Sequence, residues 1–212
     1  MANVHMKLLM IGPQGSGKGT IGEMLSEYLR VPLISVGETL RDLPKTHPKY
    51  QEVQDTINKG NLAPVEVVGE LLKERVSQPD CAKGFIFDGW ARRLKDLKYF
   101  DPKFDKVIFL QISPETTVKR LSTRRTCEKC NRVFNIETVP PKVEGTCDVC
   151  GGRLLQRDDD TPEAILKRLD IFNTETLPVV NYFREKGVLL EINAETPPKN
   201  VFEDVLKALN IS

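Results

Sequence analysis

The chain carries five short runs of apolar residues, separated by longer stretches in which apolar side chains recur every three or four positions. The longer stretches predict amphipathic helices. Because the short runs are almost continuously apolar, we expect strands that are buried on both faces of a parallel sheet. The pattern predicts an α/β fold with a five-stranded parallel sheet and helices on both faces. The predicted strands are 7–11, 32–35, 85–88, 106–112 and 188–192.

Two segments interrupt this alternation of strands and helices. Residues 36–63 are polar and helical, and they are too long for a simple connection between strands. Residues 126–160 have few helical signals but several prolines and glycines. We expect both segments to be inserted into one core, and we call them the first lobe and the second lobe. The core would then consist of residues 1–35, 64–125 and 161–212.

The helix that follows the second lobe has a recognisable start. Thr161 can cap it, with Pro162 at its first position. We expect this helix to bend or break near Pro178 and to end at Gly187.

The composition excludes several classes of protein. A formal net charge of +1 over 212 residues argues against a general polyanion binder, so any phosphate affinity has to come from local clusters of charge. No apolar run approaches the roughly 20 residues that span a bilayer. The apolar residues near the N-terminus belong to the first strand rather than to a signal peptide. We therefore expect a cytoplasmic monomer without a membrane partner.

A glycine-rich segment, Gly-Pro-Gln-Gly-Ser-Gly-Lys-Gly-Thr at 12–20, stands between the first predicted strand and a predicted helix. In this context the glycines let main-chain N–H groups surround an anion, and the helix adds the positive end of its dipole. Lys18 supplies a mobile charge for the β- and γ-phosphates. The segment, called the phosphate loop below, predicts binding of a nucleoside triphosphate. The predicted contacts are Gly15, Ser16, Gly17, Lys18, Gly19 and Thr20.

The phosphate loop departs from the strict pattern at one position. Gly19 stands where a magnesium-binding hydroxyl usually follows the lysine, and Thr20 comes one residue later. We expect Mg²⁺ to be held through Thr20 or through water.

Four of the five cysteines form two Cys-x-x-Cys pairs with sixteen residues between them. In a reducing compartment this pattern indicates a metal site rather than disulfides. Four thiolates at this spacing predict a tetrahedral site for Zn²⁺, and they leave no open position for catalysis. The alternative is a redox-active or unligated set of thiols. The predicted ligands are Cys127, Cys130, Cys147 and Cys150, whereas Cys81 is expected to be a small, partly buried side chain.

Paired zinc knuckles also occur in nucleic-acid-binding proteins. The second lobe contains Lys129, Arg132 and Lys142, but acidic residues lie among them and no basic stripe results. Phe134 alone is a weak stacking platform for bases. We therefore expect no nucleic-acid partner.

Charged side chains follow several of the predicted strands, at the edge where parallel sheets bind ligands. Asp88 ends the third strand, where a carboxylate can orient the waters around Mg²⁺. Arginines also recur after strands and beside the second lobe, and forked guanidinium groups stabilise a phosphoryl group in transit. The candidates are Arg41, Arg92, Arg120, Arg124, Arg157 and Arg168, whereas Arg93 and Arg125 are expected to face solvent.

Taken together, these segments resemble the adenylate kinase family of nucleoside monophosphate kinases over essentially the whole chain. The resemblance rests on residues 12–20, 37–41, 84–92, 120–125 and 157–160, on the cysteine pairs and on Arg168. It is strongest for the bacterial long form with a zinc-bearing lid. It implies a P-loop NTPase-type core, a first lobe that binds the nucleoside monophosphate (NMP), and a second lobe that is a lid over ATP.

The resemblance also implies roles for individual residues. Lys18 would bind the transferring phosphates, and Arg41 and Arg92 the acceptor phosphate. Arg124, Arg157 and Arg168 would clamp the bridge between the two nucleotides, while Arg120 and Phe134 would contact the donor. Further implied contacts are Val133 and Thr196 for ATP, and Val36, Asn61, Leu62, Ala63, Gly89, Trp90, Ala91 and Asp96 for the NMP.

The acceptor-base pocket departs from the family pattern at four positions. Val36 replaces a threonine, Trp90 a phenylalanine and Ala91 a proline. Asp96 replaces a glutamine that reads the edge of adenine. Glutamine both donates and accepts, whereas a carboxylate only accepts and would suit the adjacent N–H and NH₂ groups of guanine.

The acceptor base therefore stays open at this stage. Residues 64–66 resemble the corresponding stretch of UMP/CMP kinases, so GMP, CMP and UMP are alternatives to AMP. Asp96 has an alternative too, an ion pair with a neighbour such as Lys95 or Lys98, well clear of the base.

The activity that we expect is a reversible, Mg²⁺-dependent transfer of the γ-phosphoryl group from ATP to AMP. Transfer is direct and in line, and it needs no buried base because the attacking phosphate oxygen is already anionic. Two other classes are a nucleotide-hydrolysing switch and a zinc-ribbon nucleic-acid-binding protein.

Overall fold

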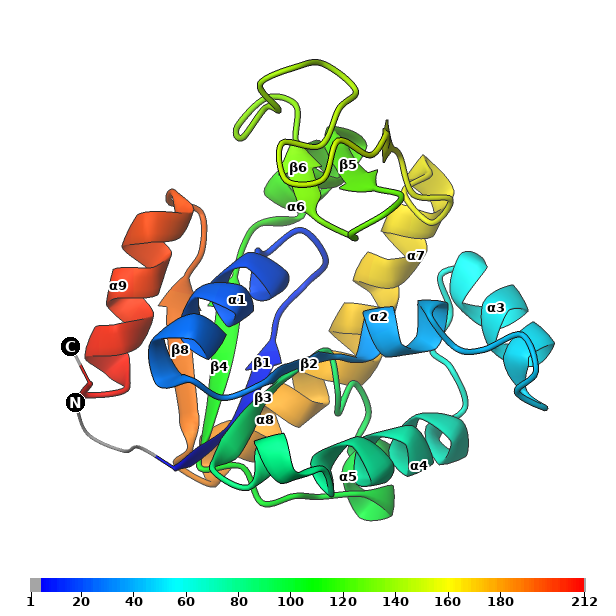
Figure 1. Cartoon of the computed structure of the whole chain (residues 1–212). Coiled ribbons are helices and arrows are strands. Elements are labelled where there is room, and N and C mark those ends of the chain that lie inside the picture. The colour runs from blue at the N-terminus through cyan, green and yellow to red at the C-terminus, as the bar shows by residue number, and fades with distance from the viewer. Residues whose placement is uncertain (1–4, 212) are drawn as a thin grey trace.

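The computed structural model describes residues 5–211, and a parallel sheet of five strands lies at its centre (Figure 1). The strand order is β2-β3-β1-β4-β8, and all four neighbouring pairs are parallel. The sheet confirms the five predicted strands, with ends that differ by at most one residue. The strands are β1 Met6–Ile11, β2 Leu33–Ser35, β3 Gly84–Asp88, β4 Lys106–Gln111 and β8 Leu189–Asn193.

Helices cover both faces of the sheet because successive strand residues point to opposite sides. Leu8 and Met10 pack with helices α1 (Lys18–Leu29) and α9 (Pro198–Ala208). Leu9 of the same strand packs on the opposite face, with helices α4 (Val65–Val76) and α8 (Leu177–Glu185). The central strand β1 is therefore buried on two sides, which explains why its sequence is apolar without alternation. The other core helices are α5 Leu94–Tyr99, α6 Pro114–Ser122 and the short η1 Pro79–Cys81.

The order of the strands creates a binding edge. The chain leaves β1 through the phosphate loop into α1, and β1 lies between β3 and β4. β2 and β3 lie on one side of β1, whereas β4 and β8 lie on the other, so the connections diverge there and leave a crevice at its carboxyl end. Asp88, the last residue of β3, pairs in register with Met10 beside this crevice.

The first lobe contains two short helices, α2 (Val36–Arg41) and α3 (Tyr50–Asn58). The Ser35 side chain caps α2 by accepting a hydrogen bond from the N–H of Glu38. Val53 of α3 is fully buried, so this helix is anchored although most of its side chains are polar. Figure 1 shows α2 below the strands of the second lobe, to the right of the loop that follows β1.

The second lobe forms a separate antiparallel sheet in the order β6-β5-β7. Its strands are β5 Arg124–Cys127, β6 Val133–Asn135 and β7 Leu154–Leu155. Its buried cluster consists of Phe134 and Leu154 with two of the cysteines, Cys127 and Cys147. Because this core is so small, the cysteines are important for the stability of the second lobe.

The helix after the second lobe begins as predicted but is interrupted earlier than predicted. The hydroxyl of Thr161 accepts the N–H of Ala164 at 3.2 Å and caps α7 (Pro162–Ile171). A π-helical turn, η2 (Phe172–Thr176), then joins α7 to α8. Because Pro178 has no N–H to donate, regular hydrogen bonding is lost in the turn before it rather than at the proline itself. No helix in residues 5–211 is long and apolar enough to cross a bilayer.

Candidate active site

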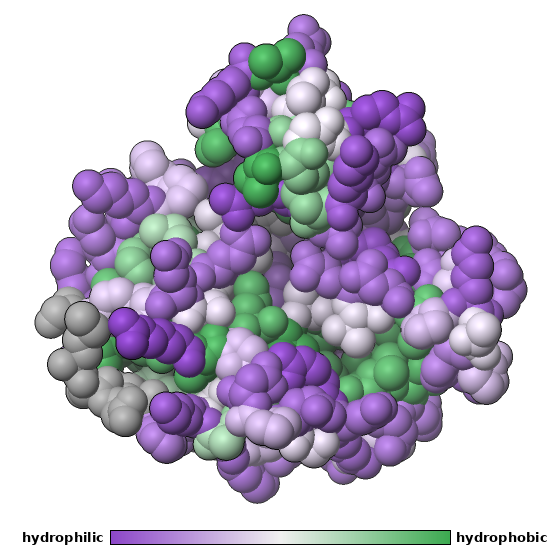
Figure 2. All heavy atoms as spheres, in the orientation of Figure 1, coloured by the Kyte–Doolittle hydropathy of each residue, from purple (hydrophilic) through white to green (hydrophobic). Residues whose placement is uncertain are grey.

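A cleft of about 740 Å³ lies between the phosphate loop, the first lobe and the second lobe. Figure 2 shows it as a hollow below the second lobe, with hydrophilic residues along its rim. All the nucleotide-contacting and catalytic residues predicted from the sequence line this cleft, with the exception of Ala91. Residues from six separate segments of the chain therefore face one cavity.

Ala91 differs from the other predicted contacts because it is fully buried and does not reach the cleft. Its φ angle is 53°, in the left-handed region. Proline is restricted to a φ near −65°, so the backbone at this position could not accommodate the proline that the family pattern has. The replacement of proline by Ala91 is thus accompanied by a backbone conformation that proline cannot adopt.

The phosphate loop wraps around the side chain of Lys18. Gly15 and Gly17 have φ angles of 81° and 90°, which turn the main chain in a way that other residues rarely adopt. The ammonium group of Lys18 donates to the carbonyls of Gly12 and Pro13, both at 2.9 Å. Burial lowers the pKa of Lys18 to about 8, and the carboxylate of Asp88 opposes part of that shift. The loop therefore holds a cation that an anionic ligand would stabilise.

Asp88 faces the start of α1. A Cβ built on Gly19 would lie 4.0 Å from Oδ2 of Asp88, so glycine at this position leaves room between the carboxylate and the helix. Thr20, one residue further along, is exposed in the cleft. A carboxylate and a hydroxyl on one side of the phosphate loop are oxygen ligands of the kind that Mg²⁺ and its waters take.

Arginines from several elements converge on the other side of Lys18. Arg92 follows β3 and donates from Nε to the Gly89 carbonyl at 3.0 Å. The pKa of Arg92 is lowered by burial and further by the positive charges of Arg168 and Arg41. Burial also lowers the pKa of Arg157 to about 10, with Arg124 and Arg41 adding to the effect. The cluster has a deficit of negative charge, which phosphate groups would supply.

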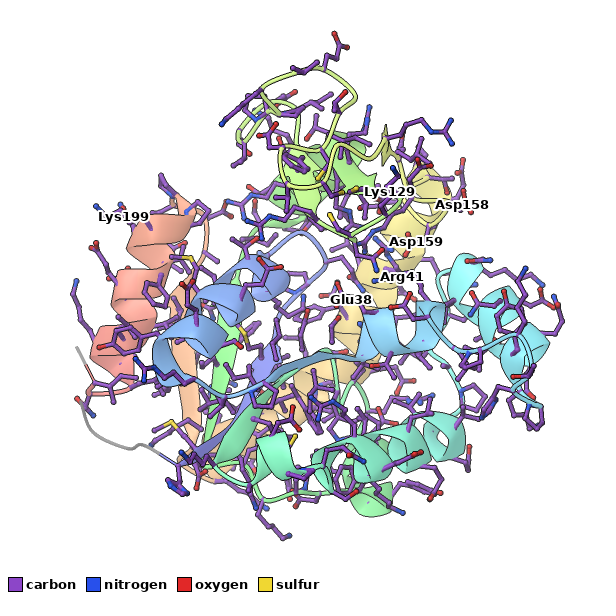
Figure 3. All side chains as sticks on the ribbon, in the orientation of Figure 1. Glu38, Arg41, Lys129, Asp158, Asp159 and Lys199 are labelled. Carbon is purple, nitrogen blue, oxygen red and sulfur yellow. The ribbon has the colours of Figure 1, made fainter. Side chains whose placement is uncertain are left out.

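Acidic residues at the end of the second lobe orient two of these arginines. Arg124 donates from Nε to Asp160 at 2.8 Å, and Arg168 donates to both Asp159 and Asp160. Figure 3 shows Asp159 at the lower edge of the second lobe, facing Glu38 and Arg41 on α2. At the phosphate loop, Arg120 donates to the Gly15 carbonyl at 3.2 Å and to the Ala194 carbonyl at 3.0 Å.

The four paired cysteines come together in the second lobe. Their Sγ atoms all lie within 4.8 Å of one another, with 3.4 Å between Cys127 and Cys150 and 3.6 Å between Cys130 and Cys147. A tetrahedron with metal–sulfur bonds of about 2.3 Å has edges of about 3.8 Å, so the cluster has the size of a four-thiolate zinc site. A Cβ on Gly152 would lie only 2.8 Å from Cys127 Sγ, which explains glycine beside the cluster.

Comparison with known proteins agrees with this geometry. A sequence model described as "Adenylate kinase" matches residues 10–188. A protein named adenylate kinase from Fervidobacterium nodosum is 40% identical, covering 96% of this chain and 95% of its own length. Proteins of the same name from Thermosipho melanesiensis and Archaeoglobus fulgidus are 36% and 38% identical, with alignments that span 96% and 94% of this chain and 99% and 96% of theirs.

The chain belongs to the adenylate kinase family. It is accordingly a phosphotransferase, and the similarity to the family inferred from its motifs is confirmed. The α/β fold with a five-stranded parallel sheet is confirmed as well.

Two arginines of the chain are placed differently from what the sequence predicted. Arg93 does not face solvent, because its side chain is only 16% exposed and donates from Nη2 to the Ala63 carbonyl at 3.1 Å. Arg125 is half-buried, and its guanidinium donates to the carbonyls of Ser122 and Arg124. The Arg93 guanidinium bonds to a main-chain carbonyl that is distant in sequence, whereas the Arg125 guanidinium bonds to carbonyls of nearby residues. No sequence pattern marks these carbonyls as acceptors.

Asp96 has a partner other than the two that the sequence suggested. Its buried carboxylate forms an ion pair with Arg93, not with Lys95 or Lys98, and it lines the cleft instead of lying clear of it. The spacing of three residues between Arg93 and Asp96, at the start of a helix, was the sequence signal that could have predicted this ion pair. Cys81 is 6% exposed, and the Arg75 guanidinium donates to its Sγ at 3.1 Å, far in sequence from the cysteine cluster.

Proposed function

We propose that this member of the family transfers the γ-phosphoryl group of ATP reversibly to AMP, giving two molecules of ADP. The observation that carries the proposal is the convergence of Lys18, Arg92, Arg124 and Arg168 around one cleft, since each of the three arginines acts electrostatically on Lys18. Two phosphate chains of like charge can approach only where such cations surround them. The relatives named adenylate kinase support AMP as the acceptor.

We assign the two ends of the cleft to the two nucleotides. The phosphate loop, Arg120, Phe134 and Thr196 would hold ATP, with the second lobe (126–160) as its lid. The first lobe (36–63), together with Arg41, Arg92 and Trp90, would hold the NMP. Both assignments rest on the lining of the cleft and on the resemblance to the family. We expect the enzyme to act as a monomer in the cytoplasm.

The residues of the chain would act by binding and orientation. The attacking phosphate oxygen is already anionic, so no side chain has to remove a proton. Lys18 and the arginines would stabilise the charge that spreads over the equatorial oxygens in transit. Mg²⁺, when bound with ATP, neutralises phosphate charge, and Asp88 and Thr20 are the residues that would hold its water ligands. Closure of the second lobe would exclude water from the phosphoryl group.

Four thiolates of the right spacing fit Zn²⁺, and we propose that it has a structural role. Cys127, Cys130, Cys147 and Cys150 would fill its coordination sphere and leave no position for substrate. The ion would give the second lobe the rigidity that its small core does not provide.

A coupled assay with ATP and each of AMP, GMP, CMP and UMP tests the proposed function. We expect turnover to be fastest with AMP and to depend on Mg²⁺. Release of phosphate from ATP without any acceptor would instead indicate a hydrolysing switch. Tight binding of an oligonucleotide with no transfer to any monophosphate would indicate a nucleic-acid-binding protein.

Replacing Asp88 with asparagine is expected to lower kcat by about 10–100-fold, because the neutral amide orients the waters around Mg²⁺ less well. The apparent affinity for Mg²⁺ should fall as well, which is measured by titrating Mg²⁺ at fixed ATP. Asp204→Asn on the exposed face of α9 is the matched control and should leave both values unchanged. Wild-type Mg²⁺ dependence in the Asp88 variant would contradict the assigned role.

A further inference from the structure

Gln14 is the residue of the phosphate loop, besides Lys18, that has a long polar side chain. It is half-buried, and its amide oxygen Oε1 is fully covered. Among residues 5–211, no donor is bonded to this oxygen. Because a covered acceptor without a hydrogen bond costs free energy, Oε1 of Gln14 needs a donor nearby.

Arg168 on α7 has a covered donor that is unused in the same way. Its side chain is 7% exposed, and its two terminal nitrogens donate to Asp159 and Asp160. Nε, the third nitrogen of the guanidinium, is covered and bonds to no acceptor among the described residues. The stem is enclosed as well, since a Cβ built on Gly60 would lie 3.4 Å from Cγ of Arg168. The guanidinium is therefore held in place while its Nε–H group keeps no partner.

Gln14 and Arg168 both line one small cavity beside the cleft. The cavity has a volume of about 20 Å³ and lies between the phosphate loop, the segment after β3 and the end of α7. A water molecule needs about 10–15 Å³ and two to four polar partners, so the cavity has room for one water but not for a phosphate group.

A third polar side chain in the wall of this cavity is Thr176. Its hydroxyl donates to the Arg92 carbonyl at 3.1 Å, and its oxygen can still accept a hydrogen bond. The wall therefore combines one donor, Nε–H of Arg168, with two acceptors. This combination matches a water molecule, which accepts through its oxygen and donates through two hydrogens.

We propose that this cavity binds one water molecule, through which Gln14 positions Arg168. The water accepts a hydrogen bond from Nε–H of Arg168 and donates one to Oε1 of Gln14. Its second hydrogen is available to the hydroxyl of Thr176.

The water connects two parts of the cleft. Gln14 belongs to the phosphate loop that surrounds Lys18, and Arg168 is one of the arginines that converge on the other side of Lys18. Arg168 is then held by two carboxylates and by the phosphate loop before any substrate arrives. A charge that is fixed in advance needs no reorganisation during phosphoryl transfer. This catalytic consequence rests on the proposed function.

A crystal structure of the unmodified protein at high resolution tests the water directly. We expect one ordered water within about 3.2 Å of both Oε1 of Gln14 and Nε of Arg168. The phosphate loop and α7 both belong to the core segments, so the result does not depend on a nucleotide or on closure of the second lobe. A direct hydrogen bond between the two side chains would overturn the proposal, and so would a cavity without an ordered water.

The variant Gln14→Met keeps the length of the side chain but removes the acceptor. It should lower kcat by about 10-fold and change the KM for ATP by less than about twofold. The reason is that Lys18 and the main chain of the loop still bind ATP, whereas Arg168 is positioned less precisely. Gln78→Met, at an exposed glutamine before η1 that does not line the cleft, is the matched control and should change neither value. A wild-type kcat in Gln14→Met would contradict the positioning role.

A second background separates positioning of Arg168 from an effect on the fold of the loop. Arg168→Met removes every donor of the guanidinium. In this background Gln14→Met should lower kcat by less than about a further twofold, because the residue through which it acts is already gone. An equal loss of kcat in both backgrounds would show that Gln14 acts on the loop itself, and the proposal would be wrong.

The failures of the two proposals can be told apart. Fast transfer to AMP by a wild-type protein whose crystal structure lacks the water would overturn this inference and leave the proposed function standing. An ordered water between Gln14 and Arg168 in a protein that transfers no phosphoryl group to AMP would overturn the proposed function and the catalytic consequence, but not the water site.

Discussion

Lys18→Met is expected to lower kcat for phosphoryl transfer by about 10³-fold or more, because the variant loses the one cation that sits inside the phosphate loop. The protein should nevertheless become more stable, by about 1–2 kcal/mol at pH 7. Burial lowers the pKa of Lys18 to about 8, so keeping this side chain charged in the folded state costs free energy. Its hydrogen bonds to the loop carbonyls offset part of that cost.

The lowered pKa of Lys18 also predicts that the difference in stability between the wild type and Lys18→Met depends on pH. Below pH 8 the lysine is charged in both states and its cost is fully present. Between pH 8 and 10.5 the unfolded chain binds more protons than the folded protein, so the stability of the wild type rises toward that of the variant.

Denaturant unfolding at several pH values measures this convergence, and a coupled assay measures kcat. Lys83→Met, at an exposed lysine before β3 that does not line the cleft, should change neither. A loss of stability in Lys18→Met with kcat preserved would contradict both expectations.

Cys147→Ser is expected to abolish the proposed binding of zinc and to lower Tm by about 5–10 °C, because the second lobe loses the centre of its small core. Cys147 is 2% exposed and belongs to that core, so the lobe should open locally while the parallel sheet stays folded. Chelation of the wild-type protein should reproduce the change. Metal content and thermal unfolding are the measurements.

Val149→Ser is the matched control for the cysteine variant. Val149 lies in the same lobe between two of the cysteines, is 64% exposed and contributes no thiol. The Val149→Ser variant should keep the metal content and the Tm of the wild type. An unchanged Tm after verified removal of the metal from the wild type would show that the ion does not stabilise this lobe.

Much of the fold could be predicted from the sequence because its signals are local. The strands are continuous apolar runs, and the cap at Thr161 uses a side chain three residues from its partner. The phosphate loop is likewise one uninterrupted segment whose chemistry is set by residue type and spacing. The cysteine pairs belong to the same class, since the spacing of the ligands fixes the geometry of the site.

The features that the sequence did not predict depend on contacts between distant segments. Arg93 turns inward because the Ala63 carbonyl, thirty residues away, accepts its guanidinium. The partner of Asp96 follows from that placement. The left-handed backbone at Ala91 has no signal in an alanine, and the π-helical turn arises where Pro178 removes a main-chain donor. Propensity alone does not determine such details.

The ion pair between Arg124 and Asp160 joins the first strand of the second lobe to a residue two positions before α7. The chain thus leaves the core and returns to it at one narrow connection. A segment attached in this way can be shortened, lengthened or exchanged for a relative's version while the parallel sheet of the core keeps its register. We therefore expect changes in the length of the second lobe to leave the parallel sheet folded.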